Sequence, residues 1–510
     1  MKKNLYIIIA TVCMLFVSCD KFLDVAPDNR TVLDNPTAVQ ELLVSAYPSG
    51  QYFHVCEVMS DNVGERNVSG THSRAILNEE MYTWQEGFQA GTGHDTPFYL
   101  WRGCYNAIAS ANQALATIAA VSDPEKYTAQ KGEALVCRAY AHFILVNMFA
   151  EHYDPNNANE MLGVPYVDEP EDIVIKYYKR SSVAEVYRRI EEDLLAGIVL
   201  IDDKAYSVPK YHFTKAAANA FAARYYLYTG NWDKVIEYAN ACLGSNYADK
   251  LLPLNTAAFM GISSDEYEAK YRTVEQPNIL LLVGCPSSWG RDAGSSSLRY
   301  GMVAAQRVAI YTSPNVGGTN ATYYRAWSSS SSGAYYMHKY FDYFKRSYPG
   351  SSTGTSHTMG AHFMLEDVLL MRAEAYAMKG AAYFDSAVND IHTLLLKRVS
   401  GAYVPVTLSK INDFYLTGAT AANYPDLSPF YNINEDQKGL LKCIVDWRQK
   451  EFMSDGLRWF DIKRFHLAVT HTFPNTNKYA TMTLAPYDLR RALQIPMEAQ
   501  AFGIEPNQRP

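Results

Sequence analysis

A short pattern that occurs twice restricts this chain to a largely helical fold. An alanine is followed three positions later by a tyrosine, and the tyrosine four positions later by a glycine, in a helix-like run that ends there. We interpret each copy as a helix hairpin in which the small residue lets two helices approach, the tyrosine fills the groove and the glycine makes the turn. Two unrelated helix ends remain the alternative. The copies are Ala223-x-x-Tyr226-x-x-x-Gly230 and Ala373-x-x-Tyr376-x-x-x-Gly380.

Helical periodicity extends over much of the chain. Apolar residues from Trp101 to Ile118 recur at three- and four-residue steps or their sums, and a second helix is predicted from about Tyr127 to Phe149. Trp232 follows the first glycine as in a tetratricopeptide unit, although neither copy fits the full consensus. We predict a mostly α fold with a tetratricopeptide-like scaffold of helical hairpins. Its parts are expected at about 36–50, 98–250, 361–400 and 437–470.

Two long segments between these helices have a different character. Residues 51–97 and 252–360 are rich in Gly, Ser, Asn and Tyr and lack helical periodicity. Loops of this length inside a compact protein are usually functional or disordered, and their aromatic content argues against disorder. We therefore expect long irregular insertions that carry the ligand site, with part of the chain's 39 tyrosines on the surface.

The first residues are typical of a bacterial export signal. Lys2 and Lys3 precede an apolar run from Leu5 to Val17, which is too short to span a bilayer. Residues Leu15-Phe16-Val17-Ser18-Cys19 look like a lipobox, which predicts a signal peptide at 1–18 and a lipidated Cys19 at the start of the mature chain. Acyl chains on that cysteine would anchor the protein to a membrane. The alternative is an ordinary signal peptide with a chance cysteine.

Composition excludes some classes of function. Without residues 1–18 the chain has 44 basic and 53 acidic residues, a net charge of about −9, and nucleic acid binding needs a basic face instead. The six cysteines beyond Cys19 are widely scattered and form no CxxC pair, so buried free thiols are favoured over disulfides.

Motifs for catalysis and metal binding are weak. Gly350-Ser351-Ser352-Thr353-Gly354 satisfies GxSxG, but no strand precedes it and no apolar helix follows. Asp154, Asn156 and Asn159 form a polar loop that could bind calcium, although the EF-hand spacing fails because position 12 is Pro165. We predict no enzymatic activity, no catalytic residue, no metal-ligating motif and no cofactor, with bound calcium left open.

Four segments, taken in order, resemble the SusD/RagB family, the surface lipoproteins of Bacteroidota that capture nutrients for a partner outer-membrane transporter. The fourth segment departs from the family pattern at Asp455 and at Trp447, just before its first arginine, where the family usually has glutamate. The segments are Cys19-Asp20-Lys21-Phe22-Leu23-Asp24, Trp101-x-x-x-Tyr105-x-x-Ile108-x-x-x-Asn112 with Arg138-Ala139-Tyr140, Leu369-Leu370-Met371-Arg372-Ala373-Glu374-Ala375-Tyr376, and Arg448-x-x-Glu451-Phe452-x-x-Asp455-Gly456-x-Arg458-Trp459-x-Asp461.

This resemblance implies one SusD-like domain from 19 to 510, held by its lipid in the outer membrane at the cell surface. It also implies binding of an oligosaccharide or polysaccharide and its delivery to a SusC-like TonB-dependent transporter. Peptide or glycopeptide binding by the same architecture is one alternative, and a lipid-anchored glycoside hydrolase is another. We interpret charges such as Arg372 and Asp461 as buried pairs that fix helix packing, since they lie at helical spacing beside apolar residues.

Sugar binding needs aromatic rings to stack on pyranose faces and polar groups to hydrogen-bond the hydroxyls. In the family the ligand is contacted by loops from the middle of the chain and from the segment before the Trp101 helix. These loops show no motif to match, so our candidates rest on the chemistry of exposed rings in polar loops. They are Trp84, Phe88 and Asn78 in the first insertion, with His94 beside them, and Trp289, Arg291, Tyr300, Tyr323, Tyr324 and Trp327 in the second.

Overall fold

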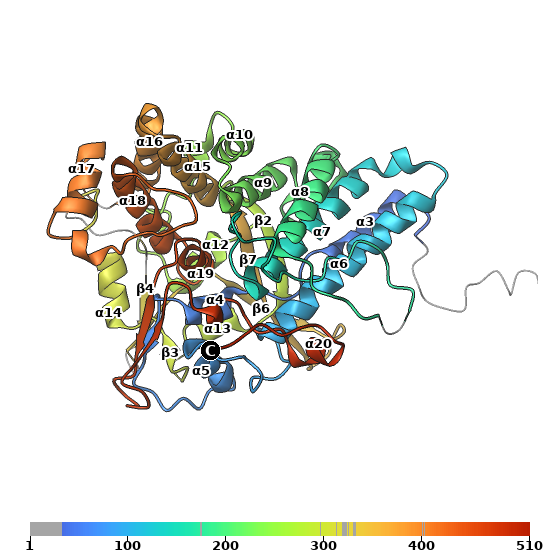
Figure 1. The fold of residues 1–510 in the computed structure, drawn as a ribbon, viewed down its shortest axis with the longest axis horizontal. Coiled ribbons are helices and arrows are strands. Elements are labelled where there is room, and N and C mark those ends of the chain that lie inside the picture. The colour runs from blue at the N-terminus through green and yellow to red at the C-terminus, as the bar shows by residue number, and fades with distance from the viewer. Residues whose placement is uncertain are drawn as a thin grey trace, which may run out of the picture.

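The computed structural model describes residues 33–510 apart from 174–175, 296, 313, 319–323, 325, 330–332, 400 and 402. The predicted signal peptide and Cys19 therefore lie outside the described residues. Within the described part, no helix combines the length and hydrophobicity needed to cross a membrane. The fold is mostly helical, as predicted, with short strands and irregular segments gathered below an arc of long helices (Figure 1).

Consecutive antiparallel helices form the scaffold. Each of the helices α6 to α10 packs against the next, and the stack continues after the second insertion (Figure 1). The scaffold helices are α6 (Pro97–Ala120), α7 (Thr128–Phe149), α8 (Val183–Ile198), α9 (Lys215–Thr229), α10 (Trp232–Leu243), α15 (Leu365–Lys379), α16 (Phe384–Leu395), α18 (Glu435–Glu451) and α19 (Leu457–Arg464).

The repeated pattern forms two hairpin turns, as predicted. Gly230 ends α9 with φ +73°, and the following N–H of Asn231 donates to the carbonyl of Tyr226 at 2.9 Å. The ring of Tyr226 stacks on Tyr238 of α10 with centroids 5.5 Å apart. Gly380 ends α15 with φ +95° and ψ −170°, a different positive-φ conformation. Glycine is needed at both positions because other residues are strained at positive φ.

The second insertion is more regular than predicted. It contains a three-stranded antiparallel sheet in the order β2-β7-β6, which packs against α9 and leads directly into α15. Gly350 to Gly354 lies in the turn between two strands of this sheet, and this is not the strand-turn-helix geometry that a nucleophile elbow requires. The strands are β2 (Ile279–Pro286), β6 (Phe341–Arg346) and β7 (Gly354–Met364).

Shorter elements complete the loop-rich half. The remaining strands form three two-stranded pairs, β1 (Gly64–Glu65) with β3 (Tyr300–Gly301), β4 (Ala326–Ser329) with β5 (Ala334–Met337), and β8 (Val469–Thr472) with β9 (Thr481–Leu484). The remaining α-helices are α3 (Pro36–Leu43), α4 (Phe53–Met59), α5 (Ala75–Tyr82), α11 (Tyr247–Lys250), α12 (Ser264–Tyr271), α13 (Trp289–Asp292), α14 (Ala304–Arg307), α17 (Leu408–Asn412) and α20 (Met497–Ala501).

Buried ion pairs join the scaffold helices, which confirms the structural interpretation of the signature charges. Arg448 of α18 contacts Asp367 of α15 at 2.7 Å and Asp461 of α19 at 2.9 Å. Arg464 in turn contacts Asp461 and Glu374, and all five side chains are buried. Removing one partner of such a network leaves an uncompensated buried charge, so these residues fix how the helices pack.

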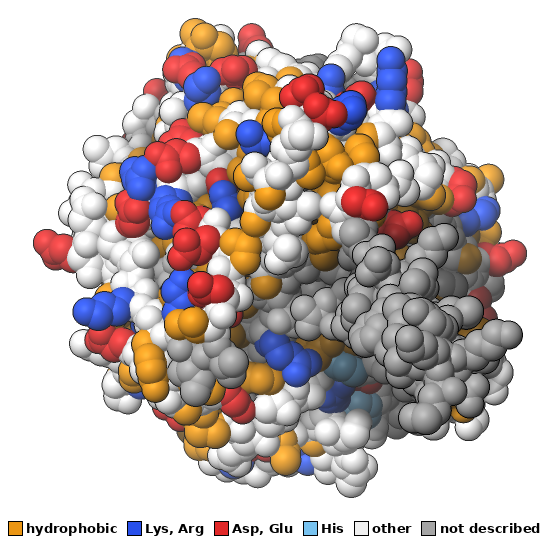
Figure 2. Space-filling model, turned by 90° about the vertical axis from the view of Figure 1, so that its right-hand side faces the viewer, with side chains coloured by type: hydrophobic (Ala, Val, Ile, Leu, Met, Phe, Trp, Pro, Cys, Tyr) orange, Lys and Arg blue, Asp and Glu red, His pale blue; other side chains and the backbone are white. Residues whose placement is uncertain are grey.

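The state of the cysteines and the distribution of surface charge also follow what the sequence indicates. Six cysteines lie in the described part of the chain, and all six are buried free thiols, as favoured above. On the face shown in Figure 2, acidic and basic side chains are interspersed rather than segregated.

Candidate ligand-binding site

Most of the predicted aromatic contacts are packed inside the protein. Trp84, Trp289, Tyr300 and Tyr324 are all buried, and the expectation that these rings are exposed is wrong. The physical reason is that these loops pack against the rest of the protein, where burying aromatic surface is favourable, so their rings join the main hydrophobic core. Phe88 and Trp327 are half-buried, and Tyr323 lies outside the described residues.

Each of these buried residues has a specific structural partner. The indole N–H of Trp84 donates to the carbonyl of Met59 at 2.9 Å. Asn78 exchanges two hydrogen bonds with the backbone of Tyr300, at 2.9 and 2.8 Å, and so joins the first insertion to the second. Trp289 donates from its indole N–H to the carbonyl of Ser454 at 3.0 Å. The hydroxyl of Tyr324 donates to the buried carboxylate of Glu451.

A cavity of about 880 Å³ does open between the two insertions, and we name it the loop groove. Among the predicted residues, Arg291 and His94 line it. One wall comes from the segment 72–94 and the other from α13 and the β6–β7 hairpin. The residues that line it are His72, Ser73, Arg74, His94, Ser287, Ser288, Arg291, Asp292, Ser295, Phe344, Gly354, Thr355 and Ser356.

The loop groove combines one exposed ring with several polar groups. Phe344 of β6 is 52% exposed, so part of its ring is available to a ligand. Arg291 is held beside it by an ion pair of 2.6 Å to Asp342 and by a hydrogen bond to the hydroxyl of Ser356. Hydroxyl, guanidinium and imidazole groups therefore surround a ring, as a sugar-binding surface requires.

Electrostatics at the groove favour a neutral polar ligand. Burial raises the pKa of Asp342 to about 6, although Arg291 lowers it. Burial also lowers the pKa of His94, so this imidazole is mainly neutral at pH 7. Arg291 is paired with Asp342 and Arg74 lies 3.9 Å from Asp95, so the charges at the groove are largely balanced and serine hydroxyl groups are also offered to a ligand.

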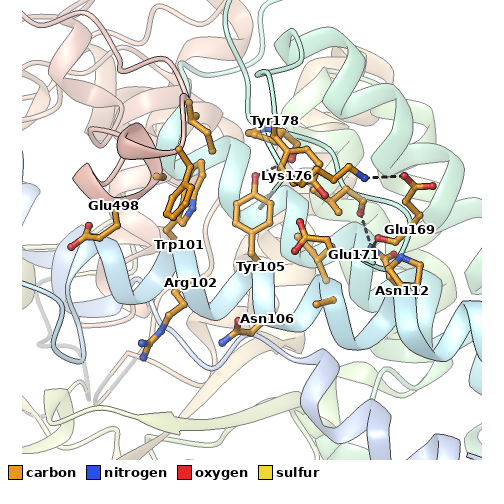
Figure 3. Close-up of a pocket in the computed structure, with 18 of the residues that line it drawn as sticks. Trp101, Arg102, Tyr105, Asn106, Asn112, Glu169, Glu171, Lys176, Tyr178 and Glu498 are labelled. Carbon is orange, nitrogen blue, oxygen red and sulfur yellow. Dashed lines mark hydrogen bonds and ion pairs between the residues drawn. The ribbon is translucent and has the colours of Figure 1, made fainter. Parts of the chain in front are cut away.

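A second groove, which the sequence analysis did not identify, lies on the scaffold between α6, the segment 165–178 and α20. This scaffold groove has a volume of about 590 Å³. In Figure 3, Tyr105 points from α6 toward Tyr178, Trp101 lies on the side of Glu498 of α20, and Lys176 pairs with Glu169 at 3.0 Å. Asn112 donates to the carbonyls of Val167 and Glu169. The Trp101 motif therefore fastens a loop onto the first scaffold helix.

Two sets of residues have donor atoms suited to a metal. In the loop considered for calcium, Asp154 accepts local hydrogen bonds from the backbone and side chain of Asn156, and calcium binding there stays a prediction. A different set, His54, Asp95 and Asp292, places three donor atoms within 4.8 Å of one another beneath the loop groove.

Comparisons with known proteins agree with this architecture. A family model described as "Starch-binding associating with outer membrane" matches residues 21–227, and the SusD family model matches residues 287–502. A SusD-like protein P2 from Formosa agariphila is 26% identical over 183 residues, which is 35% of this chain. That match spans only 31% of the relative's own length.

Solved structures match nearly the whole chain. A SusD superfamily protein from Bacteroides thetaiotaomicron has a TM-score of 0.66 at 17% identity, covering 93% of this chain and 100% of that one. A SusD superfamily protein from Bacteroides vulgatus has a TM-score of 0.64 at 17% identity, covering 93% and 99%. A laminarin-binding SusD-like protein has a TM-score of 0.57 at 17% identity, covering 93% and 99%.

The two family models together match most of the chain, and the scaffold, the paired signature charges and the solved structures agree with them. The chain belongs to the SusD family.

Proposed function

We propose that this protein binds an oligosaccharide or polysaccharide in the loop groove and delivers it to a TonB-dependent transporter in the outer membrane. The observation that carries the proposal is the exposed ring of Phe344 among polar and paired charged groups, in a cavity of about 880 Å³ between the two insertions. The starch-binding description of one matching family model and the laminarin-binding structural relative support a glycan as the ligand class.

Binding in this site would be shallow and polar. A pyranose ring would stack its C–H face on Phe344, while Arg291 and the serine hydroxyls would hydrogen-bond its hydroxyl groups. Asp342 is engaged by Arg291, and Asp95 accepts hydrogen bonds from Gln51 and from the backbone of Ser288. These carboxylates therefore serve as acceptors that hold the groove walls, and the proposal assigns no catalytic step to them.

The anchor belongs to the same proposal. A lipidated Cys19 would hold the protein at the outer membrane, where the captured glycan can pass to the transporter. Co-purification of the transporter from detergent-solubilised membranes tests this part. Cys19→Ala should release the protein from the membrane fraction, whereas an unchanged distribution would refute the anchor.

Calorimetry of the purified protein, without residues 1–19, against starch oligosaccharides, laminarin oligosaccharides and peptides tests the ligand class. We expect heat of binding with a glycan, and a loss of about tenfold or more in affinity for Phe344→Ala, which corresponds to about 1.4 kcal/mol. Phe502→Ala is the matched control, because Phe502 is 50% exposed but lines the scaffold groove.

Two outcomes would contradict the proposal. Peptide binding without glycan binding would favour the peptide alternative. Release of new reducing ends from a bound glycan would identify a hydrolase.

A further inference from the structure

Three residues far apart in the sequence meet beneath the loop groove. His54 belongs to α4, Asp95 lies just before α6, and Asp292 is the last residue of α13. One donor atom from each lies within 4.8 Å of the other two, and all three side chains are buried. The set therefore comprises one imidazole nitrogen and two carboxylate oxygens that converge from three independent elements.

His54 provides an independent observation that points to a ligand. Its side chain is 0% exposed, yet neither ring nitrogen has a hydrogen-bond partner among the described residues. A buried polar group without a partner is destabilising and rare in native proteins. The imidazole cannot turn away, because it stacks on the buried ring of Trp289 with centroids 4.7 Å apart and planes 18° apart.

The spacing of the three donors explains why no direct hydrogen bond forms. A carboxylate close to an imidazole would normally accept its N–H at about 2.7–3.2 Å. Ligands of one metal ion, each about 2.0–2.2 Å from it, must instead lie about 3–4 Å apart. The three donor atoms lie within 4.8 Å of one another and the imidazole makes no hydrogen bond to either carboxylate, so a small closing movement would bring them to this second arrangement.

The two carboxylates are oriented by neighbouring donors. Asp95 accepts from the Gln51 amide at 3.0 Å and from the Ser288 N–H at 3.1 Å. Asp292 accepts from the Ser288 hydroxyl at 2.6 Å. Such outer contacts fix the direction of ligating oxygens in protein metal sites.

Two basic side chains face the same carboxylates from the groove side. His72 Nε2 lies 3.5 Å from Asp292, and Arg74 lies 3.9 Å from Asp95. His72 is not itself a fourth ligand, because its Nδ1 accepts the backbone N–H of Arg74, which leaves the proton on Nε2. Arg74 competes with a metal ion for Asp95.

We propose that His54, Asp95 and Asp292 form a binding site for a divalent transition-metal cation of the zinc class. An imidazole nitrogen with two carboxylates suits such an ion, whereas calcium and magnesium prefer ligand sets made of oxygen. Asp292 also lines the loop groove, so the proposed site lies against that cavity. Burial lowers the pKa of His54, although Asp95 and Asp292 raise it, and a neutral imidazole is the form that ligates. This proposal does not rest on glycan binding.

Calorimetric titration of the chelator-treated protein with zinc chloride tests the site. We expect saturable binding of a single equivalent of Zn²⁺. Asp292→Asn and His54→Gln should each lower the affinity for zinc. The loss should exceed the factor of about 10 to 100 that removal of an outer-sphere partner causes. His72→Gln is the matched control, because it changes a neighbouring histidine that is not a ligand, and it should retain zinc affinity. Arg74→Gln should bind zinc more tightly than the unaltered protein.

Anomalous scattering at the zinc edge, from crystals of the unaltered protein with Zn²⁺, locates the ion even if a variant fails to fold. A peak among the three side chains supports the proposal. Absence of stoichiometric binding, binding that survives Asp292→Asn and His54→Gln, or preference for Ca²⁺ over Zn²⁺ would overturn it. A variant that loses zinc binding but retains glycan binding, or one that loses glycan binding but retains zinc binding, distinguishes this proposal from the proposed function.

Discussion

At the scale of single residues, buried charges differ in whether an opposite charge faces them. Burial raises the pKa of Asp461, but Arg448 and Arg464 outweigh it and hold the pKa below the ordinary value. Glu57 of α4 is also buried and has no ion pair among the described residues, but accepts hydrogen bonds from the Ser454 N–H at 2.9 Å and the Asn62 amide at 3.1 Å. Burial therefore dominates and raises its pKa to about 7.

Glu57 should make stability depend on pH. Its folded-state pKa lies above the unfolded value, so the folded state binds the extra proton between about pH 7 and 4.5. The free energy of unfolding should then gain up to about 3 kcal/mol from this group as the pH falls through that window. Glu57→Gln should remove this gain, as measured by urea denaturation at several pH values.

The control for this prediction is Glu435→Gln, because that carboxylate is exposed. It should leave the pH dependence unchanged. Superimposable pH profiles for Glu57→Gln and the unaltered protein would show that Glu57 titrates normally.

At the scale of elements, glycines decide where scaffold helices begin and end. Gly456 precedes α19 with φ +71°, and a Cβ there would lie 2.9 Å from Cys56 Cβ and 3.2 Å from Phe53 Cα of α4. Gly230 has a similar φ of +73°, but a Cβ there would meet only the edge of the Phe430 ring, at 3.1 Å. The two positions share the backbone strain and differ in how closely another element packs.

Gly456→Ala should therefore destabilise the protein more than Gly230→Ala. Strain at positive φ costs about 1 kcal/mol in both variants, and overpacking against α4 should add about 1–3 kcal/mol at Gly456. Urea denaturation of both variants measures the difference. Equal losses would mean that α4 shifts freely to make room.

Sequence periodicity predicted the long helices because each presents a repeating apolar face, but it missed the central sheet. The strand β7 (Gly354–Met364) begins Gly-Thr-Ser-His-Thr, which lacks an alternating apolar pattern, and its position is set by pairing with β2 and β6. The burial of the loop rings could not be predicted from the sequence either, because a tryptophan in a polar loop has the same local sequence whether it faces solvent or the protein core. The proposed metal site consists of His54, Asp95 and Asp292, which are too far apart in the sequence for any local pattern to connect them.

At the scale of the whole molecule, the turn between α18 and α19 makes several buried contacts that connect the second insertion to the scaffold. Asp455, between α18 and α19, pairs with Arg272 at 2.6 Å and accepts from the Tyr340 hydroxyl at 2.7 Å. Lys339 lies 3.5 Å from the same carboxylate, and the indole of Trp289 donates to the preceding carbonyl, of Ser454. All of these side chains are buried.

The insertion and the scaffold should consequently unfold together. Breaking the contacts at Asp455 would leave buried charges unpaired on both sides, so neither part retains its stability alone. Thermal unfolding followed by far-ultraviolet circular dichroism, which reports the helices, should coincide with tryptophan fluorescence. Asp455→Asn should lower both midpoints equally. Two separated transitions in the unaltered protein would refute this coupling.

The contacts at Asp455 also divide the second insertion into two parts that should tolerate substitution differently. Residues such as Phe344 and Ser295 line the loop groove, so substitutions there should change the groove surface at little cost in stability. Arg272, Lys339 and Tyr340 lie in the same insertion but all contact one scaffold carboxylate, that of Asp455, so substitutions there should be destabilising. The groove surface of this insertion can therefore vary more freely than the part that packs against the helices.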